Sequence, residues 1–280
     1  AGLSGMDEFL GARTVIGLDA VWGSDDVDVV YAALPAGARE ELVQSALAAG
    51  KHVLMAPPLA LDVATASRLL DTASGHDVAL GLTTASAVDP ALGAVRMQIL
   101  AGLYGAPVFW QSARMGAGPG VDWQAVAADE LGLFHHLTGL AALEVSAQRA
   151  GGASGAEVVL LTVAYRDQAI GSYAVGTGVV GSGEQTEQRR LITASGQIDL
   201  IGEPRAVRDR SVEDAPAGVW RPVRYAGERG GLEQVVARFV HGVQRGDLAT
   251  ISGGDPLEVP RILEAARTSL AEGRAVALTR

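Results

Sequence analysis

The sequence predicts a chain of the α/β plus α+β class, in which a partial parallel sheet precedes an open, mostly antiparallel sheet with helices. Two observations lead to this prediction. As far as residue 105, short apolar runs alternate with helical stretches, in the order typical of a parallel sheet. After residue 106, apolar runs follow one another at hairpin spacing. We therefore expect two domains, at residues 1–105 and 106–280.

Three strands and three helices are expected in the first domain. Its strands are short and rich in Val, Ala and Leu, as strands covered on both faces of a sheet are, and lie at 27–34, 52–55 and 78–84. Helices are expected at 38–49, after Asp62 as N-cap, and from Asp89-Pro90 to near residue 102. The second strand runs into Pro57 and Pro58, which cannot donate to a ladder.

The second domain is expected to contain six strands, one helix between the first two of them, and two closing helices. The strand candidates are 107–114, 143–149, 157–165, 168–175, 189–194 and 197–201, and the inserted helix is 124–142. The closing helices carry apolar stripes over 232–243 and 259–270, at the spacing of a buried helical face. We expect these helices to pack back towards the first domain.

Composition narrows the function classes. The 280 residues carry a net charge of -10 without a basic cluster, so nucleic acid is not an expected partner. The absence of cysteine excludes disulfides and thiolate metal sites, and no metal ligands are assigned. No stretch approaches the roughly 20 apolar residues of a membrane span, and the first residues lack a signal-peptide pattern. A cytoplasmic protein without membrane contact is expected.

Several phrases, in this order, resemble the Gfo/Idh/MocA oxidoreductase family. They are DDVDVVYAALPAG at 25–37, AGKHVLMAPPLAL at 49–61, GLYGAPV at 102–108, and SGGDPLEVPRILEAARTSLAEGRAV at 252–276, near the end of the chain. The resemblance implies a Rossmann domain joined to an α+β domain with an open sheet. It also implies a homodimer or higher homo-oligomer formed through that sheet.

The chain departs from the family pattern where the cofactor would bind. Residues 1–22 carry no G-x-G-x-x-G turn, so the first βαβ unit is expected to be missing and the Rossmann sheet truncated. GTGVVG at 176–181 fits the pattern by letter but is interpreted as a hairpin loop. In the family a Glu-Lys-Pro sequence ends the second strand above. Matched to it, Pro57 stands in place of the lysine that orients nicotinamide, and Pro57 cannot ionise.

The candidate site lies on the helix with ADELGLFHHLTGL, 128–140. No register of this stretch reproduces the family's acid, glycine, histidine and aspartate pattern. Asp129 and His136 are seven residues apart and share one helical face, whereas His135 points about 100° away from His136. The predicted catalytic residues are His136, His135, Asp129 and Arg114, and the predicted substrate-binding residues are Asp122, Trp123, Met55 and Pro57.

Each of these residues also has a structural interpretation. The two histidines could be core or interface residues, and Arg114 could pair with a surface acid. Trp123 could belong to the core.

These departures favour a repurposed family member that binds a small organic molecule in the interdomain cleft. Such a protein would need no cofactor and could assist proton transfer, isomerisation or cyclisation by positioning its substrate. The alternative is an oxidoreductase that uses NAD or NADP and acts on a sugar-like or imine substrate. A non-catalytic partner subunit is the second alternative.

Overall fold

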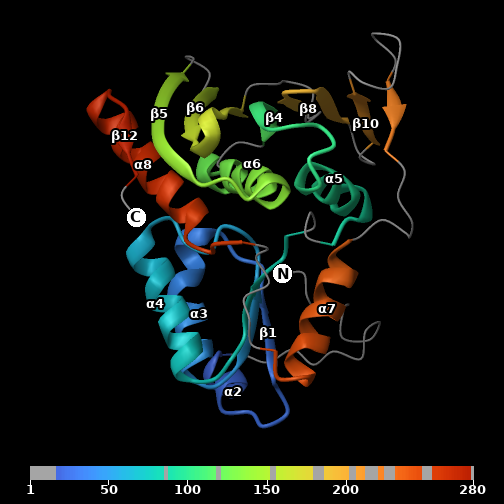
Figure 1. The fold of residues 1–280 in the computed structure, drawn as a ribbon. Helices are drawn as coiled ribbons and strands as arrows, with labels where there is room; N and C mark the ends of the chain where they lie inside the picture. The colour runs from blue at the N-terminus through green and yellow to red at the C-terminus, as the bar shows by residue number, and fades with distance from the viewer. Residues whose placement is uncertain are drawn as a thin grey trace.

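The computed structural model describes residues 17–84, 88–117, 121–151, 156–178, 186–201, 206–211, 220–223, 231–247 and 254–278. These residues form a three-stranded sheet and a nine-stranded sheet, each with its own helices (Figure 1). The first sheet is parallel and the second is mostly antiparallel, so the predicted fold class is confirmed. In this part of the chain, no helix has the length and apolar character needed to cross a membrane.

The first unit is built on the strands β1 (Val29–Ala32), β2 (His52–Met55) and β3 (Leu80–Leu82), in that spatial order. Helices α3 (Ala36–Ala48) and α4 (Val63–Gly75) cover one face, and the short α2 (Asp19–Trp22) precedes β1. Asp62 caps α4 as expected, accepting a hydrogen bond of 2.7 Å from the Thr65 amide. The expected β-α-β-α-β order of this unit is therefore present.

The opposite face of the small sheet is covered by a helix from the far end of the chain. Helix α7 (Leu232–Gln244) places Val235 and Phe239 against Leu54 and Ala79. Its apolar stripe explains this docking, since one face of the helix must be removed from water. Helix α7, one of the two closing helices, thus packs on the small sheet.

The nine-stranded sheet has the order β11-β10-β9-β8-β4-β7-β6-β5-β12, and only β4 and β7 pair in parallel. Its strands are β4 (Pro107–Ala117), β5 (Ala142–Gly151), β6 (Glu157–Tyr165), β7 (Ile170–Thr177), β8 (Thr186–Thr193), β9 (Gly196–Ile201), β10 (Ala206–Ser211), β11 (Arg221–Pro222) and β12 (Val276–Ala277). Strand β10 lies outside the six strand candidates of the sequence.

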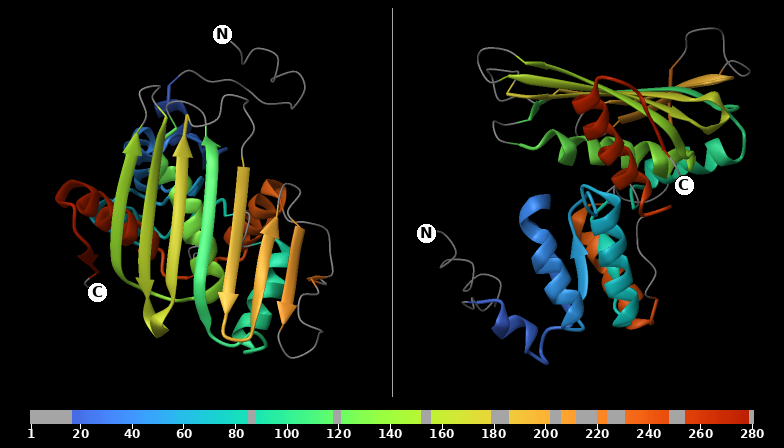
Figure 2. Two further views of the ribbon diagram at one scale, coloured as in Figure 1. Left: turned by 90° about the horizontal axis from the view of Figure 1, so that it is seen from above. Right: turned by 90° about the vertical axis from the view of Figure 1, so that its left-hand side faces the viewer.

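Helices α5 (Pro90–Leu100), α6 (Trp123–Thr138) and α8 (Glu258–Glu272) lie on one face of this sheet. No described helix covers the other face, as the view onto the strands shows (Figure 2). The core beneath the sheet centres on Trp110, Phe134 and Tyr165, whose rings pack with centroids 5.6 and 4.6 Å apart. Helix α6 therefore lies between the large sheet and the first unit.

Helix α6 ends earlier than its apolar pattern suggested. The prediction ran to residue 142, but the helix stops at Thr138 because Gly139 adopts a left-handed conformation, with φ of 68°. Two bonds tie the surrounding helices together: Arg96 of α5 donates to the carbonyl of His136, and the Val63 amide of α4 donates to Glu264 of α8. The domain boundary at residue 105 falls between α5 and β4, and remains a prediction.

Candidate functional site

The carboxyl ends of the parallel strands point towards α6 (Figure 1). The loops that follow β1 and β2 are joined there by Arg39, which is 2% exposed. Its guanidinium donates to the carbonyl of Leu34, at 3.0 Å, and to that of Pro58. Burial lowers the pKa of Arg39 to about 10, against the raising effect of Glu40. A charged side chain thus fixes the two loops at the strand ends.

Helix α6 presents its least covered stripe away from the large sheet. Asp129, Gly132 and His136 lie on this stripe, whereas Glu130 and Phe134 point inward to the core. A Cβ atom at Gly132 would meet nothing within 4 Å, and the Asp129 side chain is 45% exposed. The helix therefore offers an acid and a histidine on either side of open space.

The two histidines at the end of α6 have different surroundings. Burial lowers the pKa of His136 to about 4, and the nearby charges of Arg96, His135 and Arg238 act in the same direction. Its Nδ1 atom is buried without a hydrogen-bond partner. The Nδ1 of His135 lies 3.2 Å from the carbonyl oxygen of Leu140, and its ring packs on Gly254. At neutral pH His136 is an uncharged imidazole with a free nitrogen.

A chain of alternating charges leads from the core to Asp129. Glu130, which is 1% exposed, receives two bonds of 2.7 and 2.6 Å from Arg189 and one of 2.5 Å from the Ser112 hydroxyl. Arg189 also donates to Glu187, at 2.7 Å. Glu187 lies 3.2 Å from Nε of Arg114. This chain, from Glu130 to Asp129, is called the charge chain below.

Arg114 forms the last link of the charge chain. Its Nη1 lies 3.3 Å from a carboxylate oxygen of Asp129. Desolvation raises the pKa of Asp129 above its ordinary value, while Arg114 acts in the opposite direction. Both side chains of this pair are partly exposed, so the pair can meet a ligand while the charges behind it hold its orientation.

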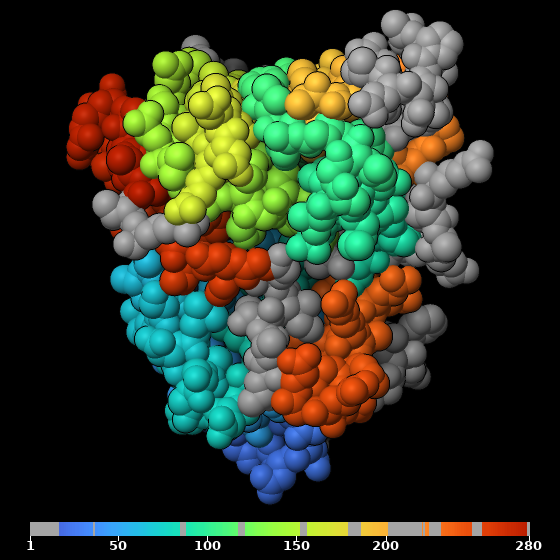
Figure 3. All heavy atoms as spheres, in the orientation of Figure 1, coloured from blue at the N-terminus to red at the C-terminus, as the bar shows by residue number. Residues whose placement is uncertain are grey.

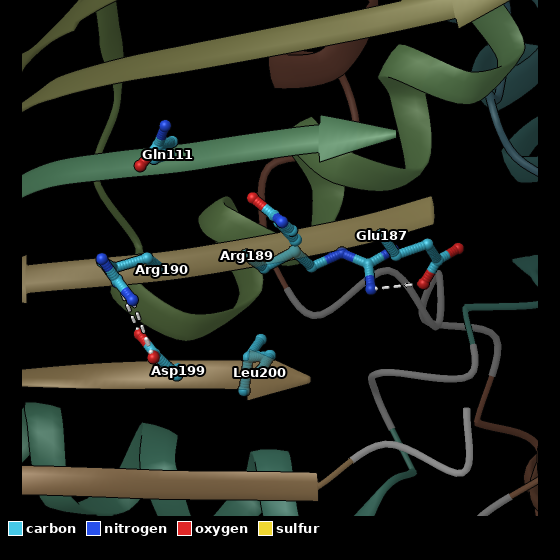
Figure 4. Close-up of a pocket in the computed structure, with 7 residues that line it drawn as sticks. Gln111, Glu187, Arg189, Arg190, Asp199 and Leu200 are labelled. Carbon is cyan, nitrogen blue, oxygen red and sulfur yellow. Dashed lines mark hydrogen bonds and ion pairs between the residues drawn. The ribbon is translucent and has the colours of Figure 1, made fainter. Parts of the chain in front are cut away.

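A polar pocket adjoins the charge chain on strands β4, β8 and β9. It has a volume of about 260 Å³ and is lined by Gln111, Glu187, Gln188, Arg189, Arg190, Asp199 and Leu200 (Figure 4). Arg190 binds Asp199 with two bonds, of 2.7 and 3.0 Å. The charged groups that line the pocket are paired with one another, so we assign no ligand to this pocket.

The structure groups only some of the predicted site residues. Arg114, Asp129 and His136 are brought to the same side of α6, and Pro57 lies partly exposed in the loop after β2. Met55 is buried in the core of the first unit.

Asp122 and Trp123 lie at the other end of α6. Asp122 caps the helix, accepting a bond of 3.0 Å from the Gln124 amide, and Trp123 packs in the main core. Trp123 and His136 are thirteen residues apart, about 20 Å along the helix. The roles assigned to these two residues in substrate binding remain predictions that this placement does not favour.

Several residues of the site were missed by sequence reasoning. Arg39, Ser112, Glu130, Glu187 and Arg189 were assigned no role. The sequence does contain a signal for Arg189. Arg189 and Leu191 are two residues apart in a strand, so their side chains lie on the same, buried side of the sheet. A buried arginine requires an acid, and Glu130 lies on the inward face of α6.

The fold and this site define a class of protein, in which a Rossmann-type parallel sheet faces an α+β unit across a helix. The comparisons narrow that class. The family model GFO_IDH_MocA, described as "Oxidoreductase family, NAD-binding Rossmann fold", matches residues 5–84. The resemblance to this family seen in the sequence is therefore confirmed.

Two curated relatives carry the name dTDP-3,4-didehydro-2,6-dideoxy-alpha-D-glucose 3-reductase. The one from Streptomyces violaceoruber is 38% identical over 98 residues, which is 35% of this chain and 29% of the relative. The one from Actinomadura kijaniata is 46% identical over 66 residues, 24% of this chain and 20% of the relative. The matches thus span less than a third of either relative.

Solved structures match nearly the whole chain in fold. Levoglucosan dehydrogenase, in complex with NADH and L-sorbose, has a TM-score of 0.83 at 16% identity, covering 99% of this chain and 87% of that one. GenD2 from gentamicin A biosynthesis, in complex with NAD, has a TM-score of 0.79 at 22% identity, covering 99% and 86%. Aldose-aldose oxidoreductase from Caulobacter crescentus, complexed with glycerol, has 0.80 at 18%, covering 99% and 88%.

These findings correct two predictions. A cofactor-independent protein and the absence of a cofactor are both contradicted, since the matched family is described as NAD-binding and two of these three structural neighbours are complexes with NADH or NAD. The predictions were based on the absence of a G-x-G-x-x-G turn from residues 1–22 and on Pro57 in place of the family's lysine. Ligands of open α/β sheets bind at the carboxyl ends of the parallel strands, and this edge depends on the backbone arrangement, which remains when one side chain differs.

Proposed function

We propose that this chain acts as an NAD(P)-dependent oxidoreductase on a sugar-like substrate. The observation that carries the proposal is the position of α6 at the carboxyl ends of the parallel strands, with Asp129 and His136 on the least covered stripe of that helix (Figure 1). Ligands of open α/β sheets bind at that edge. The names of the relatives, which describe sugar reductases and dehydrogenases, support the substrate class.

The described residues fit the nicotinamide end of such a site. The loops after β1 and β2 are held by Arg39, and Asp129 and Arg114 are partly exposed polar side chains at the other side of this edge. Among the residues that the structure describes, none forms a glycine-rich turn between a strand and a helix, so we assign none to the pyrophosphate. When bound, the nicotinamide exchanges a hydride with a carbon of the substrate.

The proton that accompanies hydride exchange needs a carrier in the protein. Pro57 cannot supply it, because it has no ionisable group. The carboxylate of Asp129 is partly exposed and has a raised pKa, so it can carry the proton. His136, whose pKa is lowered to about 4, is uncharged at neutral pH. Arg114 can hold a substrate hydroxyl or carbonyl oxygen beside the Asp129 carboxylate. We assign the proton to Asp129 and substrate orientation to Arg114.

The first experiment is a fluorescence titration of the protein, in the full length in which it is naturally made, with NADH and NADPH. Saturable binding at micromolar concentration is expected with at least one of them. Turnover is then sought with a panel of sugars and sugar nucleotides. If neither nicotinamide binds, the proposal is overturned, whatever the panel shows.

We further infer that two copies associate through the open face of the large sheet. Leu160, Ile170 and Ile192 point to that face and are 36, 46 and 37% exposed, so the face keeps apolar side chains in water. Covering them with a second copy would remove this area from water.

A further inference from the structure

A cavity of about 370 Å³ lies where α6 begins, at the opposite end of that helix from His136. Three elements form its walls: the first turn of α6, the end of β5, and the last turns of α8. The lining residues are Trp123, Gln124, Arg149, Arg267, Leu270 and Ala271. Arg267, Leu270 and Ala271 are spaced by three and four residues and therefore share one face of α8.

The walls of this cavity are rigid. The Ala147 amide of β5 donates to the hydroxyl of Ser269 at 2.9 Å, and that hydroxyl donates to the carbonyl of Arg274. Strand β12 then continues the sheet beside β5. Because α8 is bonded to the strand along this stretch, the cavity does not depend on the position of a loop.

Positive charge gathers at this cavity although the whole chain carries a net charge of -10. No acid lines the cavity in the described part of the chain, and there Arg267 has no hydrogen-bond or ion-pair partner. Arg149 lies 3.5 Å from Glu157 through Nε, and half of the Arg149 side chain is exposed. Asp122 caps the helix next to Gln124 and is the one acid beside the turn.

The buried side-chain amide of Gln124 is a second observation that points to a ligand. Gln124 is 8% exposed, and its Nε2 atom is buried without a hydrogen-bond partner. Buried polar groups without partners are rare, because each loses its bonds to water. The first turn of α6 also has amide N–H groups that lack partners within the helix, which favours a negative charge there.

From these observations we propose that the cavity binds a phosphate group, either as free inorganic phosphate or as part of a nucleotide. Arg149 and Arg267 pair with its oxygens, and the amide of Gln124 donates to it. Trp123 and Leu270 provide apolar surface for the part of a larger ligand that carries the phosphate. The site lies about 20 Å along α6 from His136 and is separate from the proposed cofactor site.

Calorimetric titration of the full chain tests this proposal with three probes: inorganic phosphate, a nucleoside diphosphate, and the nucleoside alone. Saturable binding of phosphate is expected, and Arg149→Ala and Arg267→Ala should each weaken it about tenfold, as the loss of one charge-assisted bond does. Arg166→Ala is the matched control, since this exposed arginine lies at the opposite end of the β5–β6 hairpin. NADH affinity should not change in any variant.

The probes also distinguish the source of the phosphate. Tighter binding of the diphosphate than of phosphate, with competition by the nucleoside, assigns a nucleotide; equal binding assigns the free ion. The proposal is overturned if neither inorganic phosphate nor the nucleoside diphosphate binds saturably at millimolar concentration. It is also overturned if the double variant Arg149→Ala, Arg267→Ala binds these two probes as the wild type does. Both arginines are exposed, so a thermal melt should show that their variants fold.

Discussion

At the scale of single residues, the interior of the large unit is organised by one buried carboxylate. Glu130 and Arg189 are 1 and 6% exposed, and their two parallel bonds fix both side chains. Burial by itself would lower the pKa of Arg189, but the bonds and charges of Glu130 and Glu187 outweigh it and raise that pKa. A buried ion pair of this kind contributes little net stability, yet removing one of its two partners is strongly destabilising.

Replacing Arg189 by Met should therefore destabilise the protein strongly. The substitution keeps the length of the side chain but leaves Glu130 charged and unpaired in the core, which costs about 3–5 kcal/mol. Urea denaturation measures the loss of unfolding free energy. Arg274→Met is the control, since its pair with Glu272 is exposed on both sides and should change stability by less than about 1 kcal/mol. A loss below that control value for Arg189→Met would contradict the buried pair.

The low pKa of His136 predicts how stability depends on pH. In the folded protein its pKa is about 4, against 6.5 for the free side chain, so between these values the unfolded chain binds more protons. Stability should consequently fall as the pH is lowered from about 6.5 to 4, by roughly 3 kcal/mol from this group. Denaturation at a series of pH values measures the slope.

His136→Gln should flatten that slope, because glutamine does not titrate. His76→Gln, at the exposed end of α4, serves as the control. An unchanged slope in the His136 variant would show that other groups cause the dependence.

At the scale of elements, most helices and strands could be predicted because each carries its own signal. Asp62 and Asp89 cap α4 and α5 as their side chains suggested, and Pro90 opens α5. The end of α6 was missed because Leu140, Ala141 and Ala142 continue the apolar pattern while Gly139 breaks the backbone. Strand β10 has too polar a sequence, AVRDRS, to be distinguished from a loop.

The docking of α7 on the small sheet can be tested at Gly81. A Cβ atom there would lie 2.8 Å from the ring of Phe239, so Gly81→Ala forces the helix or the ring to shift. We expect a loss of about 1–3 kcal/mol, as overpacking of a core produces, together with faster proteolysis within α7. Gly75→Ala is the matched control, because a Cβ at that position meets nothing within 4 Å. Equal stability of the two variants would mean that α7 is not packed there.

At the scale of the whole molecule, pattern alone gave the two units but not how the chain connects them. The apolar stripe of α7 predicted burial, yet nothing in it specified the sheet that it covers. The candidate site shows the same limit. Asp129 and His136 could be paired by their spacing on one helix, whereas Arg189 reaches Glu130 across 59 residues, a contact that only the tertiary structure reveals.

Association through the open sheet face belongs to the same scale. Leu160→Asp combined with Ile192→Asp places two charges on that face and should convert the assembly to a monomer in sedimentation experiments. Leu103→Asp changes an apolar residue that is 63% exposed in the turn after α5, and should leave the assembly intact. A wild-type protein that sediments as a monomer would remove the basis for this interface.

The position of α7 has one more consequence. By the order of its elements, the chain passes between the two units three times: after β3, before α7 and again after it. Helix α7, in orange at the lower right, lies beside the cyan and blue residues of the first unit (Figure 3). A hybrid that exchanges the small unit for that of another protein would therefore need three junctions, because a single crossover leaves the donor's strands paired with a foreign helix. Recombination within such a chain is thus restricted to exchanges that keep α7 together with the strands of the small sheet.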